Sequence, residues 1–118
     1  MPRKTNASPN LAEVREALQE AYDSLSDAYW ASSTLEAKDR IYGVEEVVFD
    51  ALSELDREEI ETNTKAYKEV AAALEPILDQ LEKLRDDLES LVHAVKVVTQ
   101  VTSTIDRALK LATKYFGL

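Results

Sequence analysis

The only histidine of the chain, His93, is by residue type the best candidate for catalysis. Glu89 and Ser90 precede it by four and three residues, and a nucleophile, a base and an orienting carboxylate are the groups of a hydrolytic triad. This spacing places all three on one flank of a predicted helix, where they point outward side by side and do not converge on a substrate. The sequence therefore predicts that His93 is a partly exposed structural residue.

Metal and cofactor chemistry lacks the residues that it needs. A di-iron carboxylate bundle requires a Glu-x-x-His motif from each of two helices, and the chain has one histidine. The absence of cysteine excludes thiolate zinc sites and iron–sulfur clusters, and two glycines are too few for a phosphate-binding loop. Close pairs among the 23 carboxylates, such as Glu45 and Glu46, arise from their density alone. We predict no enzyme activity, no catalytic residue, no metal and no cofactor.

Three aromatic residues, Tyr22, Tyr29 and Trp30, lie close together in the first predicted helix. At helical spacing, aromatic side chains belong to a hydrophobic core more often than to a binding site. Trp30 lies off the main apolar stripe of that helix. We therefore predict Trp30 as a contact residue for a partner.

Charged residues change sign along the second half of the chain, on the flank beside the apolar stripe. Residues 45–89 carry 15 acidic and 5 basic side chains, whereas residues 90–118 carry 1 acidic and 4 basic side chains. If a continuous helix paired antiparallel with a second copy about residues 94 and 95, each acidic half would face a basic half. The predicted interface pairs are Glu75 with Lys114, Asp79 with Lys110 and Glu82 with Arg107.

Two other interpretations of this charged flank remain open. It can be a solvated face whose charges are segregated by accident. A hairpin folding at residues 93–96 would make the same oppositions within one chain, although no residue there is typical of a turn.

Composition limits the fold to helices. A chain of 118 residues that is 45% hydrophobic can bury one core, and 2 Gly and 3 Pro are too few for the tight turns of a β-sandwich or barrel. We predict an all-α fold, an antiparallel helical bundle with long, coiled-coil-like helices. It forms a single helical domain over residues 9–118, preceded by a flexible tail over residues 1–8.

Helix signals place the first two helices at about 9–31 and 34–55. The first helix begins either with Ser8-Pro9 or with Asn10, which forms a capping box with Glu13. Ser33 and Glu36 have the spacing of a second capping box, at a point where the apolar register shifts. These signals predict a break between the two helices.

The third predicted helix is long, at about 57–116. It begins with a capping box of Asp56 and Glu59, and its apolar residues keep a seven-residue repeat typical of a coiled coil. Pro76 predicts a kink or a break, and Gly117 predicts the C-terminal end. The repeat consists of Ile60, Asn63, Tyr67, Val70, Leu74, Ile77, Leu81, Leu84, Leu88, Leu91, Val95, Val98, Thr102, Ile105, Leu109, Ala112 and Phe116.

These features favour a non-enzymatic protein that acts by protein–protein interaction or assembly. A net charge of −9 argues against nucleic acid as a partner, and no apolar run is long enough to span a membrane, so we expect a cytoplasmic protein. The expected partner is a second copy in an antiparallel dimer, another protein, or both. One alternative is a compact acidic four-helix bundle that inhibits a basic protein, as immunity proteins and antitoxins do, which requires a break near residues 90–95. A bundle that binds a small ligand is the other.

Overall fold

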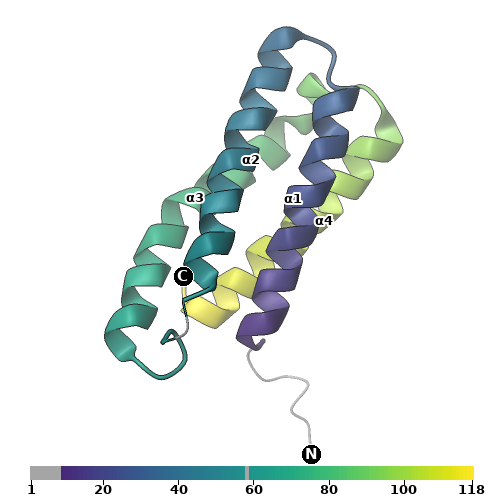
Figure 1. Cartoon of the computed structure of the whole chain (residues 1–118). Helices are drawn as coiled ribbons and strands as arrows, with labels where there is room; N and C mark the ends of the chain where they lie inside the picture. The colour runs from purple at the N-terminus through teal and green to yellow at the C-terminus, as the bar shows by residue number, and fades with distance from the viewer. Residues whose placement is uncertain (1–8, 58) are drawn as a thin grey trace, which may run out of the picture.

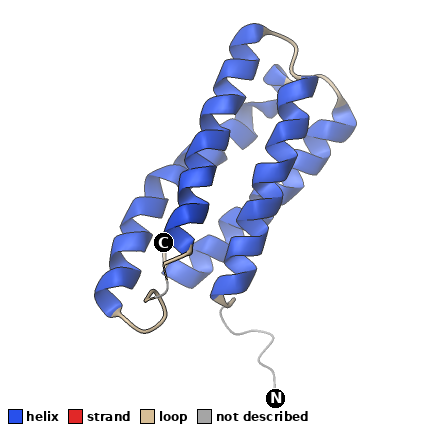
Figure 2. Ribbon diagram, in the orientation of Figure 1, coloured by secondary structure: helices blue, strands red, loops and turns tan. Residues whose placement is uncertain are grey.

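The computed structural model describes residues 9–57 and 59–118, which form an antiparallel bundle of four α-helices (Figures 1 and 2). This confirms the predicted all-α fold. The part of the chain that the structure describes contains no β-strand, and none of its helices combines the length and the apolar composition needed to cross a bilayer. The predicted tail at residues 1–8 lies outside the described residues. The helices are α1 (Leu11–Ala31), α2 (Leu35–Leu55), α3 (Thr64–Leu91) and α4 (Val95–Phe116).

Each helix packs against the two helices that are its neighbours around the bundle. α1 contacts α2 and α4, and α3 contacts α2 and α4. The turns at residues 32–34 and 92–94 lie together at one end of the bundle, and residues 59–63 lie at the other (Figure 1). The alternation of direction follows from the short connections, which return each helix alongside the one before it.

Side-chain caps explain where the first three helices begin. Asn10 accepts a hydrogen bond from the Glu13 backbone N–H at 2.8 Å, and the Glu13 side chain accepts one from the Asn10 backbone N–H at 2.9 Å. This capping box is one of the two predicted starts of α1. Thr34, and not the predicted Ser33, caps α2. Asn63 caps α3, so the prediction of a helix starting at Asp56 is wrong.

The predicted helix 57–116 is two helices, α3 and α4, and its break lies at residues 92–94. Val92 and Ala94 have extended backbones, with ψ angles of 125° and 104°. No residue of this turn needs a positive φ, so no glycine or asparagine marks it in the sequence. Val92 is buried and forms an antiparallel bridge with Ser32, and Ser33 donates its backbone N–H to the Leu91 carbonyl at 3.2 Å. Contacts with the turn between α1 and α2 therefore stabilise the break between α3 and α4. No local sequence pattern predicts these contacts.

Pro76 lies inside α3, and the helix continues through it. A proline at this position removes the backbone donor to the carbonyl of Ala72. Both residues are exposed, so water can hydrate that carbonyl. The prediction of a helix break near Pro76 is therefore wrong.

The predicted core register of α4 is also wrong. The heptad repeat predicts Val95, Thr102 and Leu109 as core positions, but Val95 is 77% exposed and the other two are only partly buried. The register slips because the turn at residues 92–94 interrupts the repeat, and α4 starts again with its own rotation. The buried residues of α4 are Val101, Ile105, Ala108, Ala112 and Phe116.

Small side chains line the seam between α1 and α4. The buried residues of α1 include Ala17, Ala21, Ser24 and Ala28, and short side chains let two helix backbones approach closely. Ser24 is almost fully buried, and its Oγ lies 2.6 Å from Oγ1 of Thr104 on α4. This contact fixes the height of one helix against the other.

Candidate functional site

A row of five aromatic side chains lies along the seam between α1 and α2, and we call it the aromatic row. Tyr22 and Phe49 face each other with ring centroids 6.1 Å apart, and Tyr29 and Tyr42 are 6.4 Å apart. Trp30 meets Tyr29 edge to face at 5.2 Å. All these distances lie within the range of favourable aromatic pairs. The row consists of Phe49, Tyr22, Tyr42, Tyr29 and Trp30.

Three members of the aromatic row are exposed by more than half. Trp30 is 75% exposed, Phe49 56% and Tyr42 54%. On α2 the apolar stripe Ile41, Val44, Val48 and Leu52 faces the core, so Tyr42 and Phe49 lie beside that stripe on the solvent side. Their exposure follows from the rotation of the helix.

One end of the aromatic row has a cation of its own. The Lys38 ammonium Nζ lies 5.0 Å from the centroid of the Tyr29 ring and 5.7 Å from that of Trp30. It also donates a hydrogen bond to the Tyr29 carbonyl at 2.9 Å. This geometry is that of a cation–π contact with both rings.

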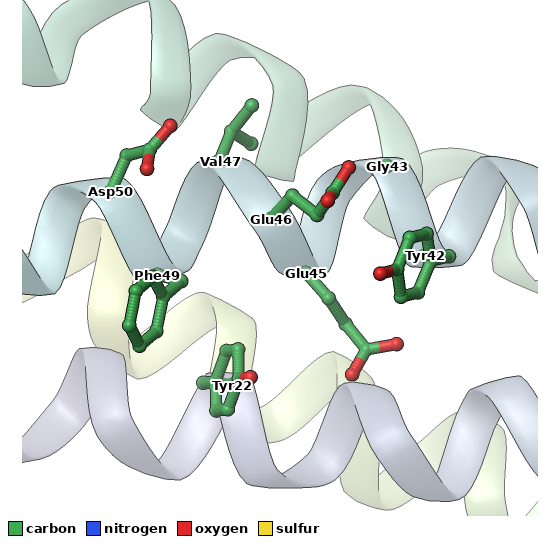
Figure 3. A pocket seen from close by; sticks show the side chains of 8 residues that line it. All are labelled: Tyr22, Tyr42, Gly43, Glu45, Glu46, Val47, Phe49 and Asp50. Atoms are coloured by element: carbon green, nitrogen blue, oxygen red, sulfur yellow. The ribbon is translucent and has the colours of Figure 1, made fainter.

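The other end of the aromatic row borders a shallow hollow of about 530 Å³, drawn in Figure 3. Its volume lies within the range typical of ligand pockets. Three carboxylates line it, and the Glu45 side chain points from α2 towards α1 (Figure 3). Partial burial raises the pKa of the Glu45 carboxyl above its ordinary value. The lining residues are Tyr22, Tyr42, Gly43, Glu45, Glu46, Val47, Phe49 and Asp50.

The face formed by α1 and α2 is strongly acidic. These two helices carry eleven acidic and three basic residues, a net charge of −8, whereas α4 carries one acidic and four basic residues. The three basic residues are engaged, because Arg15 pairs with Asp56 at 2.7 Å, Arg40 pairs with Asp87 at 2.8 Å, and Lys38 lies on the rings. The ion pairs of the described residues include none of the three carboxylates in the hollow.

The predicted interface residues lie on different sides of the bundle. Trp30 is exposed at the end of the aromatic row, as its place off the apolar stripe predicts. Glu75, Asp79 and Glu82 line a smaller hollow between α3 and α4, of about 200 Å³. Its remaining lining residues are Leu78, Leu109, Thr113 and Leu118.

The basic residues of the predicted pairs have other surroundings. Arg107 pairs with Glu20 of α1 at 3.0 Å and with Glu16 at 3.7 Å. Lys110 and Lys114 are exposed on α4. None of the three predicted charge pairs occurs among the ion pairs of the described residues. The charge reversal at His93 instead coincides with the turn that makes α3 and α4 antiparallel neighbours within one chain.

His93 lies in this turn and is exposed, so it does not share a helix flank with Ser90 and Glu89 as the sequence predicts. The Ser90 hydroxyl donates to the Asp87 carbonyl at 2.7 Å. His93 and Glu89 line a separate hollow of about 320 Å³ with Val92, Val95, Val98 and Thr99. In the described part of the chain, no three His, Asp or Glu side chains are grouped so as to hold a metal ion.

Sequence reasoning missed Tyr42, Glu45 and Phe49 as candidate site residues. Their spacing of three and four residues places them on one side of α2, just beside the apolar stripe. That spacing is the signal that could have found them, once the tyrosines of α1 were considered as partners.

Comparison of the chain with protein-family models, with curated protein sequences and with solved structures finds no match.

Proposed function

We propose that this protein is a non-enzymatic binding protein whose α1–α2 face docks onto a basic partner protein. The observation that carries the proposal is the exposed aromatic row beside Glu45, Glu46 and Asp50, which form no ion pair with the cations of residues 9–57 and 59–118. In an interface of this kind, the aromatic side chains supply the contact area and the charged side chains select the partner.

The aromatic row has the composition of a binding surface. Tyrosine, tryptophan and phenylalanine are enriched in protein interfaces, and tyrosine and tryptophan dominate their energetic hot spots. Three such side chains are exposed near one seam, and apolar surface gathered in this way is typical of an interaction site. Trp30, Tyr42 and Phe49 supply that surface here.

The charge of the face supports a basic partner. The two helices that form this face carry a net charge of −8, which accelerates encounter with a positively charged protein and repels acidic ones. A second copy docked through the same face would place these acidic helices against each other. The apolar heptad positions that predicted a dimer seam are also largely buried within the chain's own bundle, among them Leu81, Leu84 and Leu88. Self-association through the α1–α2 face is therefore the less favoured candidate.

Affinity capture from native lysate, followed by purification of the complex, tests this proposal. We expect a stoichiometric partner of high isoelectric point whose affinity falls as salt is raised. The double variant Tyr42→Ala/Phe49→Ala should lose the partner, and circular dichroism should show that it remains folded because both side chains are more than half exposed. Val95→Ala is the matched control, since it removes exposed apolar surface from α4 instead.

Two results contradict the proposal. One is a partner that the double variant binds as tightly as the wild type does. The other is a protein that captures only its own copies, with light scattering showing a dimer that the double variant abolishes.

A further inference from the structure

The two ends of the aromatic row differ in whether a basic side chain lies against the rings. At one end, Lys38 lies over the rings of Tyr29 and Trp30. At the other, Tyr22, Tyr42 and Phe49 border the hollow around Glu45 without a basic side chain. Residues 41–55 of α2 contain four carboxylates and no lysine or arginine. Among the described residues, a cation therefore lies on one half of the row only.

The register between α1 and α2 places Glu45 between two aromatic pairs. The residue numbers add to 71 both for Tyr22 with Phe49 and for Tyr29 with Tyr42. By the same register, Glu45 is level with Ser26 of α1, a side chain much smaller than the tyrosines on either side of it. Tyr22 is the α1 residue that lines the hollow, and the other lining residues come from α2.

The walls and the floor of the hollow have complementary chemistry for a cation. Ring faces carry negative potential that attracts a cation, and a carboxylate accepts its hydrogen bonds. Gly43 leaves the adjoining surface open, since a Cβ built there would meet no atom within 4 Å. In Figure 3, Tyr22 and Phe49 lie together between the two helices, and Tyr42 lies on the far side of Glu45.

We propose that this hollow binds an arginine side chain of the basic partner, with the guanidinium on the Glu45 carboxylate and against the rings of Tyr22 and Tyr42. The inference rests on the proposed function and names the group that the face recognises. Arginine is favoured over lysine because its planar group stacks on aromatic rings and can donate two parallel hydrogen bonds to one carboxylate. A bound cation would also relieve the cost of keeping a partly buried carboxylate ionised.

The test uses the tripeptide N-acetyl-Gly-Arg-Gly-amide as the probe, titrated into the full chain while the ring protons and glutamate carboxyl groups are followed by NMR. We expect saturable shifts at Tyr22, Tyr42 and Glu45 with a dissociation constant on the order of 10 mM, as for one ion pair with one cation–π contact. The matching peptide with neutral citrulline should give no saturable shift, and the lysine peptide should bind more weakly.

Two variants separate the hollow from the overall charge. Glu45→Gln should weaken binding of the arginine peptide at least fivefold, and Tyr42→Leu should weaken it as well. Glu75→Gln removes the same charge from an exposed position on α3 and should leave binding unchanged. Equal losses in Glu45→Gln and Glu75→Gln would mean that only the net charge matters, which overturns the proposal.

These experiments distinguish a failure of the arginine site from a failure of the proposed docking face. If the captured partner is lost in Tyr42→Ala/Phe49→Ala but retained in full by Glu45→Gln, and the arginine peptide does not bind, the docking face stands and the arginine site is wrong. If the arginine peptide binds in the hollow but no captured protein depends on the aromatic row, the site stands and the proposed partner is wrong.

Discussion

Substitution of Ala108 by leucine tests the register of α4. Ala108 is fully buried at the seam with α1, and the contact of Ser24 with Thr104 brings it to the level of Ala21, which is also fully buried. The continuous heptad repeat instead places Leu109 in the core and Ala108 beside it. The two registers therefore give opposite expectations for a larger side chain at residue 108.

The expected cost follows from the absence of space. Leucine adds three carbon atoms, which would gain about 2.4 kcal/mol if they entered an apolar cavity, at about 0.8 kcal/mol per methylene. No exposed surface remains at Ala108, so the added atoms must separate α1 from α4 or adopt strained rotamers. Overpacking of this kind has a net cost of about 1–3 kcal/mol. For a chain of 118 residues, 2 kcal/mol corresponds to a fall of about 8 °C in Tm.

Urea unfolding followed by circular dichroism measures this effect. The matched control is Ala72→Leu, at an exposed position of α3, which should change the free energy of unfolding by less than about 0.5 kcal/mol. The structural register is refuted if Ala108→Leu is as stable as Ala72→Leu while Leu109→Ala costs more than about 2 kcal/mol, the value of a fully buried leucine.

Substitutions at four further positions test local features of the fold by the same unfolding assay. Gly43→Ala should raise the free energy of unfolding by about 0.5–1 kcal/mol, because its added Cβ meets no atom within 4 Å and alanine favours the helix; a loss would mean that the position is crowded. Pro76→Ala should raise it by about 2 kcal/mol by restoring a backbone hydrogen bond inside α3, and no gain would mean that hydration of the Ala72 carbonyl already compensates for the missing bond. Asn10→Ala should lower it by about 1 kcal/mol through loss of the capping box, whereas Asn10→Asp should not. A hydrogen bond from Arg15 lowers the pKa of Asp56, so the pair stabilises the fold above the ordinary aspartate pKa, and this contribution is lost as the pH falls through the lowered value. Arg15→Gln should therefore be less stable than wild type at neutral pH and equal to it in strong acid; a difference that persists in acid would assign the effect to packing.

The first two helices could be predicted from the sequence because their signals are local. The Asn10 and Glu13 box and the apolar spacing that follows place the start of α1 within two residues of the observed position. The predicted second helix also agrees with α2 to within one residue at its start. Such signals depend only on neighbours along the chain, so one sequence contains them.

The turn at residues 92–94 could not be predicted because its cause is tertiary. Extended dihedral angles are open to any residue, so Val92 and Ala94 give no turn signal. The bridge from Val92 to Ser32 joins residues sixty positions apart and forms only when both hairpins are folded. The charge reversal at His93 coincides with the turn between the antiparallel helices α3 and α4, but the ion pair of the described residues that joins these helices is Arg85 with Asp106 and none of the predicted pairs.

The residues of the candidate site are brought together by the packing of α1 against α2, so the sequence alone could predict only Trp30 among them. Tyr22 and Tyr29 come from α1, while Tyr42, Glu45 and Phe49 come from α2, and neither set makes a hollow alone. The three-residue turn and the Thr34 cap fix the height of α2 against α1, so the buried stripes and the aromatic pairs come into register together. A slip of α2 by one turn would separate Tyr22 from Phe49 and move Glu45 to the level of an aromatic residue of α1. The packing of the buried side chains therefore positions the exposed ones, and the geometry of the binding face is a consequence of the fold.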